Sequence, residues 1–229
     1  MSMFTLTLAA GVLFPVAHAA DPPPPREVHL VTGSFASGDR HFGLYSPNDH
    51  IGASGARLGL RVAGRWSLVG DYTRRTVVSE YSEPMVDNAS DTAEHPTLTA
   101  SFTGQQVTLG PKFQANPLPW LGTYGTARGL LFFGTTHLDD DPTTDDNPNQ
   151  LTARARAPGF VAAAGIQVNP VLEQRSVRPS GFFEAGYGWT RPLAFVDDTI
   201  QEHSSSAPAS MGSLTFRGAY IQAGVGLRF

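Results

Sequence analysis

The chain has 229 residues and a formal net charge of −4 at neutral pH. Its acidic balance gives no reason to expect a nucleic-acid partner, which would call for a concentrated basic patch. It has no cysteine, which excludes disulfides, thiolate metal sites, cysteine nucleophiles and a lipid anchor on an N-terminal cysteine. Only 16% of the residues are charged, against ~25% in average soluble chains, yet the 41% of hydrophobic residues promises no rich soluble core.

The N-terminus has the pattern of an export address. An apolar run from Met3 to Val16 precedes the small-x-small triplet Ala17-His18-Ala19, which is typical of a secretory signal cleaved after Ala19. No Lys or Arg precedes the run, and the alternative is a membrane anchor, for which the run is short of the ~20 residues needed. Four prolines, Pro22 to Pro25, then favour a stiff extended lead-in. We predict a signal peptide over 1–19, a proline-rich lead-in over 20–26 and a single domain over 27–229.

Period-two segments separated by turn-rich stretches recur along the rest of the chain. They predict eight strands, at 27–36, 55–63, 66–78, 101–113, 121–135, 153–168, 181–193 and 213–229. Long connections, expected at 37–54, 79–100, 137–152 and 194–212, alternate with shorter ones at Ala63-Gly64-Arg65, Gln114 to Trp120 and 169–180. Membrane-spanning β-barrels sort their connections in this way, with short turns on one side and long loops on the other.

The last strand carries the sharpest motif. Going back from Phe229, one face is apolar and consists of Leu227, Val225, Ala223, Ile221 and Ala219. Here the chain resembles the bacterial outer-membrane β-barrel family, whose members end in such a strand with a terminal Phe. Its size and layout are similar to those of the OmpA-like and OmpX-like transmembrane domains. The resemblance covers about 200 residues as a pattern and implies an architecture, not an activity.

The resemblance implies an all-β fold: an eight-stranded antiparallel transmembrane up-and-down β-barrel in the cell outer membrane of a Gram-negative-type bacterium. Both termini would lie on the periplasmic side. It also implies that Phe229 is an assembly signal read by the barrel-assembly machinery.

Other strands have apolar faces of the same kind, such as Trp66, Leu68, Gly70 and Tyr72 in the third and Phe183, Ala185, Tyr187 and Trp189 in the seventh. A charge facing hydrocarbon near the membrane midplane costs ~2–4 kcal/mol in a barrel, so the charges on the opposite faces should point inward and pair. We predict a lumenal polar network of Arg57, Arg61, Asp71, Arg128 and Glu184. Eight strands enclose a lumen only wide enough for side chains, which favours a packed polar core over an open pore.

One pair within this network follows from register. If the connection Ala63-Gly64-Arg65 has three residues, Leu60 lies opposite Leu68 and Val62 opposite Trp66, all on the apolar face. The same register places Arg57 opposite Asp71 on the lumenal face. A turn of two or four residues would shift these partners.

Two groups of residues could carry chemistry. The five aspartates within 139–149 could bind a hard cation such as Ca²⁺, but their spacing fits no EF-hand, and a solvated loop bridged to lipopolysaccharide by divalent ions is the favoured interpretation. His203-Ser204-Ser205 lies in a Ser- and Pro-rich loop without a fixed orienting partner, which disfavours catalysis. The scattered histidines show no metal spacing, and we expect no cofactor.

The sequence therefore favours a non-enzymatic structural or surface-interaction protein that presents four extracellular loops. Its expected partners are outer-membrane lipids, lipopolysaccharide and an extracellular ligand that the sequence does not identify. A lipid-acting outer-membrane enzyme and a small channel or solute-binding barrel are the alternatives.

Overall fold

The computed structural model describes residues 26–39, 42, 45–46, 50–82, 97–139, 151–170, 177–197 and 210–229. They form ten strands: β1 (Arg26–Ala36), β2 (His50–Ala63), β3 (Trp66–Ser82), β4 (Thr97–Leu118), β5 (Leu121–Asp139), β6 (Leu151–Val168), β7 (Arg178–Thr190), β8 (Leu193–Asp197), β9 (Ser210–Leu214) and β10 (Arg217–Arg228). Within these residues no helix is long and apolar enough to cross a membrane. The signal peptide and all of the lead-in except Arg26 lie outside the described residues and stay predictions.

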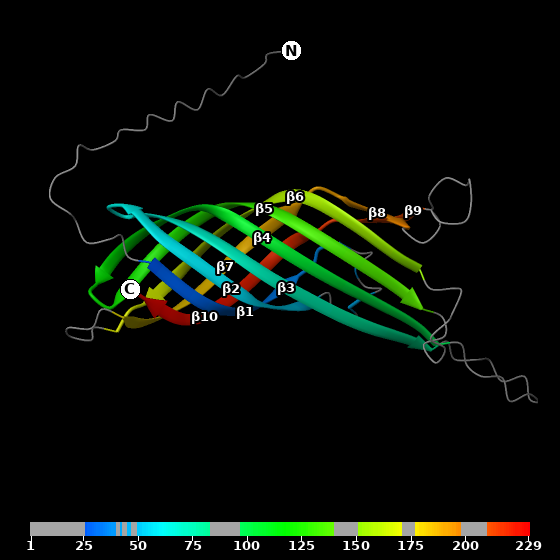
Figure 1. Cartoon of the computed structure of the whole chain (residues 1–229), viewed down its shortest axis with the longest axis horizontal. Coiled ribbons are helices and arrows are strands. Elements are labelled where there is room, and N and C mark those ends of the chain that lie inside the picture. The colour runs from blue at the N-terminus through cyan, green and yellow to red at the C-terminus, as the bar shows by residue number, and fades with distance from the viewer. Residues whose placement is uncertain are drawn as a thin grey trace, which may run out of the picture.

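The strands form one sheet that closes on itself (Figure 1). β1 to β7 pair with their chain neighbours, β7 pairs with β10, and β10 pairs with β1, all antiparallel. The short strands β8 and β9 pair with each other, and β8 also pairs with β6. β8 continues the line of β7, and β9 continues that of β10. The barrel is therefore eight strands around, as the sequence predicts. Figure 1 shows β8 and β9 at one end, here called the loop end, and the C-terminus at the opposite, terminal end.

Two of these eight strands are interrupted at the same height, one between β7 and β8 and the other between β9 and β10. Pro192 has no N–H to donate and separates β7 from β8, while Thr215 and Phe216 separate β9 from β10. The gap is bridged by hydrogen bonds: the Thr190 N–H donates to the Phe216 carbonyl at 2.9 Å, and the Phe216 N–H donates to Thr190 Oγ1 at 3.1 Å. The barrel therefore stays closed where the strands break.

Several strands are longer than the sequence predicts. β2 begins at His50 rather than 55, and β4 and β5 run on until only Pro119 and Trp120 form the turn between them. A register shift between Ala115 and Leu118 places Pro117 at an irregularity, where a strand tolerates proline. The expected long loop 194–212 is also wrong in part, since it contains β8 and the start of β9. In each case the neighbouring strand supplies hydrogen bonds that weak local alternation does not reveal.

The alternation of the strands puts apolar side chains outside and polar ones inside. Leu30, Val62 and Val225 are each more than two-thirds exposed, whereas Arg57, Asp71 and Glu184 are buried. The outward faces of the third, seventh and last predicted strands are those expected from the sequence. This distribution is the reverse of that in a soluble protein and suits a wall surrounded by hydrocarbon.

The hairpin of β2 and β3 has the expected register over most of its length. Leu60 pairs with Leu68 and Arg57 with Asp71. The turn itself differs, because Gly64 and Arg65 form a two-residue turn and a register shift lies between Arg61 and Ala63. Trp66 consequently pairs with Ala63 and not with Val62. The irregularity adds the residue that the shorter turn lacks, and the φ of +50° at Gly64 meets the turn's need for a left-handed residue.

Candidate functional site

Four charged side chains from four strands meet in the middle of the lumen. Arg57 comes from β2, Asp71 from β3, Arg128 from β5 and Glu184 from β7, and all four are buried. Arg57 Nε lies 2.6 Å from Asp71 Oδ1, and Arg57 Nη1 lies 3.0 Å from Glu184 Oε2. Arg128 forms ion pairs with the same two carboxylates. The result is a closed, neutral ring of two guanidinium and two carboxylate groups, called here the ionic quartet.

Three hydroxyl groups complete the hydrogen bonding of the quartet. The Tyr124 and Tyr220 hydroxyls donate to Glu184 at 3.1 and 2.8 Å, and the Thr108 hydroxyl donates to Asp71 Oδ2 at 3.2 Å. A buried ion pair is stable only when the remaining donors and acceptors are satisfied as well. Glycines make room for the rings: a Cβ on Gly165 would lie 2.6 Å from the Tyr124 ring, and one on Gly186 would lie 2.7 Å from that of Tyr220.

Arg61 does not belong to this group. It has the lumenal parity of Arg57, but it lies exposed at the turn, where its guanidinium donates to the Gly64 carbonyl at 2.9 and 2.6 Å. Alternation identifies the face of a strand but not the depth, and Arg61 sits at the rim, where water replaces a partner. Conversely, Tyr220 and Tyr124 were missed, although they share parity with Gln222 and Arg128 and could have been found by extending the alternation.

A second polar layer fills the lumen toward the terminal end. Lys112 Nζ lies 3.7 Å from Glu27 Oε2, and Gln167 bridges the pair through its amide, which donates to Glu27 Oε1 at 3.0 Å and accepts from Lys112. Nearby, His29 Nε2 and Ser180 Oγ lie 2.6 Å apart. The polar core expected from the sequence therefore occupies the terminal and middle parts of the lumen.

The loop end of the lumen is aromatic, which the sequence analysis did not predict. Rings pack there at centroid separations from 4.3 Å, between Phe132 and Phe216, to 6.3 Å, between Phe102 and Phe132. This loop-end aromatic cluster consists of Phe35, Phe42, Tyr45, Phe102, Phe132, Phe195 and Phe216. Burial raises the pKa of the Tyr45 phenol, partly opposed by a hydrogen bond to Thr136. An apolar plug thus lies above the ionic quartet.

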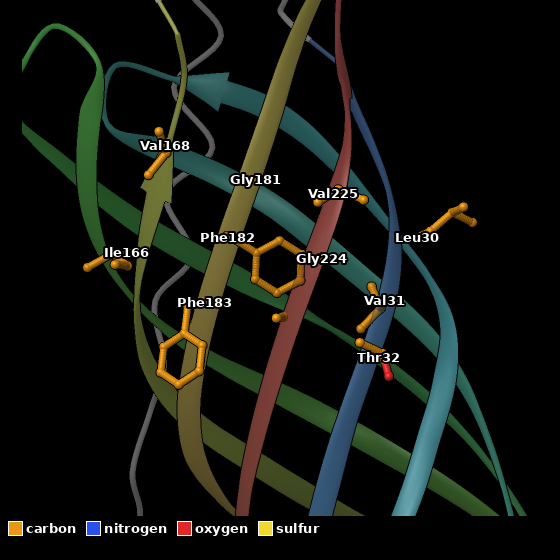
Figure 2. Close-up of a pocket in the computed structure, with 11 residues that line it drawn as sticks. Leu30, Val31, Thr32, Ile166, Val168, Gly181, Phe182, Phe183, Gly224 and Val225 are labelled. Atoms are coloured by element: carbon orange, nitrogen blue, oxygen red, sulfur yellow. The ribbon is translucent and has the colours of Figure 1, made fainter.

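The hollows of the molecule distinguish its inside from its outside. In the described part, a small hollow of about 20 Å³ lies inside the lumen, and another of about 50 Å³ lies at the terminal rim beside Arg61 and Gly64. The larger ones, of about 500 to 750 Å³, are open grooves on the outer surface. Figure 2 shows one of about 500 Å³, lined by residues of β6, β7, β10 and β1, in which Gly181 pairs with Val168 on one side and with Val225 on the other. Its lining is almost entirely apolar, as suits a lipid chain.

Exposed arginines lie where the apolar outer surface approaches the loop end. On β3, Arg74 follows Tyr72 on the outward face, and on β6, Arg156 and then Arg154 follow Phe160. Arg217 and Arg191 lie beside Trp189 at the same end of the barrel. Arg74 and Arg75 are adjacent on β3 but lie on opposite faces, because Arg74 is outward and exposed and Arg75 is inward and buried.

The two groups of residues that could carry chemistry lie mostly outside the described residues. His203-Ser204-Ser205 and positions 140–149 of the acidic segment are not described, but Asp139 is the last residue of β5 and is buried. Among the described residues, no three His, Asp or Glu side chains are grouped so as to hold a metal ion.

A closed antiparallel ring with an apolar exterior and a filled lumen defines the class of membrane-spanning β-barrels. The architecture is that of the small outer-membrane barrels that the sequence resembles. The sequence itself matches no protein-family model and no curated protein.

Several solved structures have a backbone similar to that of this chain. They include the attachment invasion locus protein Ail of Yersinia pestis, 12% identical, with 91% of this chain and 100% of that chain covered and a TM-score of 0.48. The N-terminal β-barrel domain of OprF of Pseudomonas aeruginosa is 13% identical, with 90% and 98% covered and a TM-score of 0.41. A major outer membrane protein of Thermus thermophilus is 11% identical, with 89% and 98% covered and a TM-score of 0.47. At these identities the likeness concerns the arrangement of strands and not what the chain binds.

Proposed function

We propose that the chain is an exported outer-membrane barrel with a sealed lumen, and that it works through the segments it displays at the loop end. Its role is structural or one of surface interaction, without catalysis. The observation that carries this proposal is the filling of the lumen at three levels, by the Lys112–Glu27 layer, the ionic quartet and the loop-end aromatic cluster. A barrel filled in this way has its outer wall and its ends free for function.

The outer wall supports lipid and lipopolysaccharide as partners. A transmembrane strand needs only ~9–11 residues, whereas β3 to β6 have 17 to 22, so these strands continue past the membrane at the loop end. Five outward arginines, Arg74, Arg154, Arg156, Arg191 and Arg217, lie where that continuation begins. Guanidinium groups bind phosphate through two parallel hydrogen bonds, which suits them to the phosphorylated headgroups of the outer leaflet.

The position of Phe229 supports the proposal that the barrel-assembly machinery is a transient partner. Its side chain is half exposed beside the seam where the first and last strands meet. The Arg26 N–H donates to the Phe229 carbonyl at 2.8 Å, and the Phe229 N–H donates to the Arg26 carbonyl at 3.0 Å. Phe229 thus forms the last hydrogen-bonded pair between the first and last strands, while its phenyl ring stays accessible.

A channel is the weaker alternative, because ions would have to pass the quartet and the aromatic cluster. An enzyme is weaker as well. In the described residues, the serine–histidine pair joined by a side-chain hydrogen bond, Ser180 with His29, is buried within the lumen. His29 Nδ1 has no hydrogen-bond partner in the described part of the chain, so no carboxylate orients the ring as nucleophilic catalysis requires.

The experiment is reconstitution of the refolded protein into planar lipid bilayers and into vesicles containing lipopolysaccharide. We expect no single-channel conductance and no release of fatty acid. Steady conductance steps would overturn the sealed lumen, and released fatty acid would overturn the non-enzymatic role. A variant of the plug, Phe132→Ala, tests whether the assay responds to the lumen, and Phe133→Ala, on the lipid face of the same strand, is its matched control.

A further inference from the structure

Arg75 is a buried cation that the ionic quartet does not include. It lies on the inward face of β3, one position from the exposed Arg74, and its side chain is enclosed by the lumen. Its Nη2 donates to Gln106 Oε1 at 2.8 Å, and its guanidinium carbon lies 4.8 Å from the centre of the Phe35 ring. Its Nε has no hydrogen-bond partner among the described residues.

Among the described residues, the charges of the lumen do not balance around Arg75. The quartet is neutral by itself, because each of its two guanidinium groups is matched by a carboxylate. No ion pair joins Arg75 to a carboxylate within the described part of the chain. A charge buried without a counter-charge is strongly unfavourable, and arginine does not escape by losing its proton. An anion near Arg75 would supply the counter-charge that the described residues do not.

A cavity of about 20 Å³ lies beside Arg75, between the quartet and the loop-end aromatic cluster. Three side chains around it have buried N–H groups without partners in the described structure: Arg75 Nε, Arg128 Nε and Gln222 Nε2. All three are donors. A cavity above ~10–15 Å³ holds one water-sized species, so the space admits one small occupant and no large one.

We propose that the barrel binds one small monovalent anion, a halide such as chloride, in this cavity. A halide accepts hydrogen bonds from every direction and uses all three free donors, whereas a water molecule would have to place its own two hydrogens among them. The halide also cancels the charge of Arg75. Phe35, Phe132 and Phe216 belong to the apolar part of the lining and shield the ion from the loop end.

The test uses the full mature chain refolded into zwitterionic detergent. Because the cavity is enclosed, the protein is refolded separately in sodium chloride, sodium bromide and sodium gluconate at equal ionic strength. Gluconate is too large for the cavity. We expect Tm to rise by about 3–6 °C for each tenfold increase in chloride or bromide above its Kd, since binding to the folded state alone stabilises it logarithmically. Gluconate should give no such rise.

Two variants and one crystal separate the site from a general salt effect. Arg75→Gln should lose the halide response, while Arg74→Gln, the outward neighbour, should keep it. Bromide in crystals of the unmodified protein should give an anomalous peak beside Arg75, which tests the site even if Arg75→Gln fails to fold. Equal Tm values in chloride and gluconate, a halide response that persists in Arg75→Gln, or water in place of bromide beside Arg75 would each overturn the proposal.

Discussion

Removing Asp71 perturbs the ionic quartet at a carboxylate that accepts four hydrogen bonds. Asp71 accepts from Arg57 through both oxygens, at 2.6 and 3.1 Å, and also from Arg128 and Thr108. Asp71→Ala would leave two guanidinium groups facing the single carboxylate of Glu184. Removal of one partner of a buried ion pair costs about 3–5 kcal/mol, and the loss of hydrogen bonds to both guanidinium groups at once places this case at the upper end.

The double variant Arg57→Ala with Asp71→Ala should be more stable than Asp71→Ala alone. It leaves Arg128 opposite Glu184, one charge of each sign, with the Tyr220 hydroxyl still donating to Glu184 at 2.8 Å. Residues in one ion-pair network show interaction energies of about 0.5–3 kcal/mol, and the shared partners favour the upper part of that range here. Two losses that simply add would instead show that the groups do not form a unit.

The assay is urea unfolding from detergent micelles, followed by tryptophan fluorescence and by the heat-modifiable band on gels. Arg61→Ala is the matched control, because Arg61 has the parity of Arg57 but lies exposed at the turn. It should shift the unfolding free energy by no more than about 0.5 kcal/mol. A double variant less stable than Asp71→Ala, or an Arg61→Ala variant as damaging as Arg57→Ala, would refute the reasoning.

Four further outcomes follow from the fold. Phe132→Ala should destabilise the barrel by about 3–5 kcal/mol, as loss of a fully buried ring does, while Phe133→Ala, exposed on the lipid face, should cost far less in the same urea titration. Deleting Phe229 removes both backbone hydrogen bonds to Arg26 and should lower the amount of heat-modifiable protein in membranes; normal levels would argue against an assembly signal. Replacing 140–149 by a short Gly/Ser linker should leave a heat-modifiable barrel, because lengthening or shortening a loop changes little closure entropy, but the linker must spare the buried Asp139. N-terminal sequencing of the membrane-extracted protein should begin at Ala20, and an intact Met1 would remove the argument for export.

The sequence was sufficient to predict the number of strands around the barrel and which side of most strands points outward. Alternation with period two is a local property, and the wall built from β10 shows it residue by residue from Ala219 to Leu227. Register in the β2–β3 hairpin was also accessible, because one apolar face had to be shared by Leu60 and Leu68. The exact turn was not, since a two-residue turn with an irregularity and a regular three-residue turn give the same pairing of Arg57 with Asp71.

Depth and packing within the lumen were beyond the sequence. Leu130 to Phe133 is a continuous apolar run, so alternation does not tell which members face inward and form the loop-end aromatic cluster. Arg57 and Asp71 share a hairpin, but Arg128 and Glu184 come from β5 and β7, and only closure of the ring brings them across the lumen to that pair. Arg61 shows the converse, a residue with the right face whose position at the end of a wall removes it from the network.

Site-specific labelling tests most directly the claim that this barrel spans the outer membrane with its turns inside and its loop end outside. The chain contains no cysteine, so a single introduced thiol reports its own position. Thr144→Cys lies in the acidic connection, and Arg65→Cys lies in the tight turn between β2 and β3. In intact cells a membrane-impermeant maleimide should label Thr144→Cys and spare Arg65→Cys until the outer membrane is permeabilised, with both proteins heat-modifiable in the membrane fraction. Labelling of Arg65→Cys in intact cells, or protection of Thr144→Cys, would contradict the account.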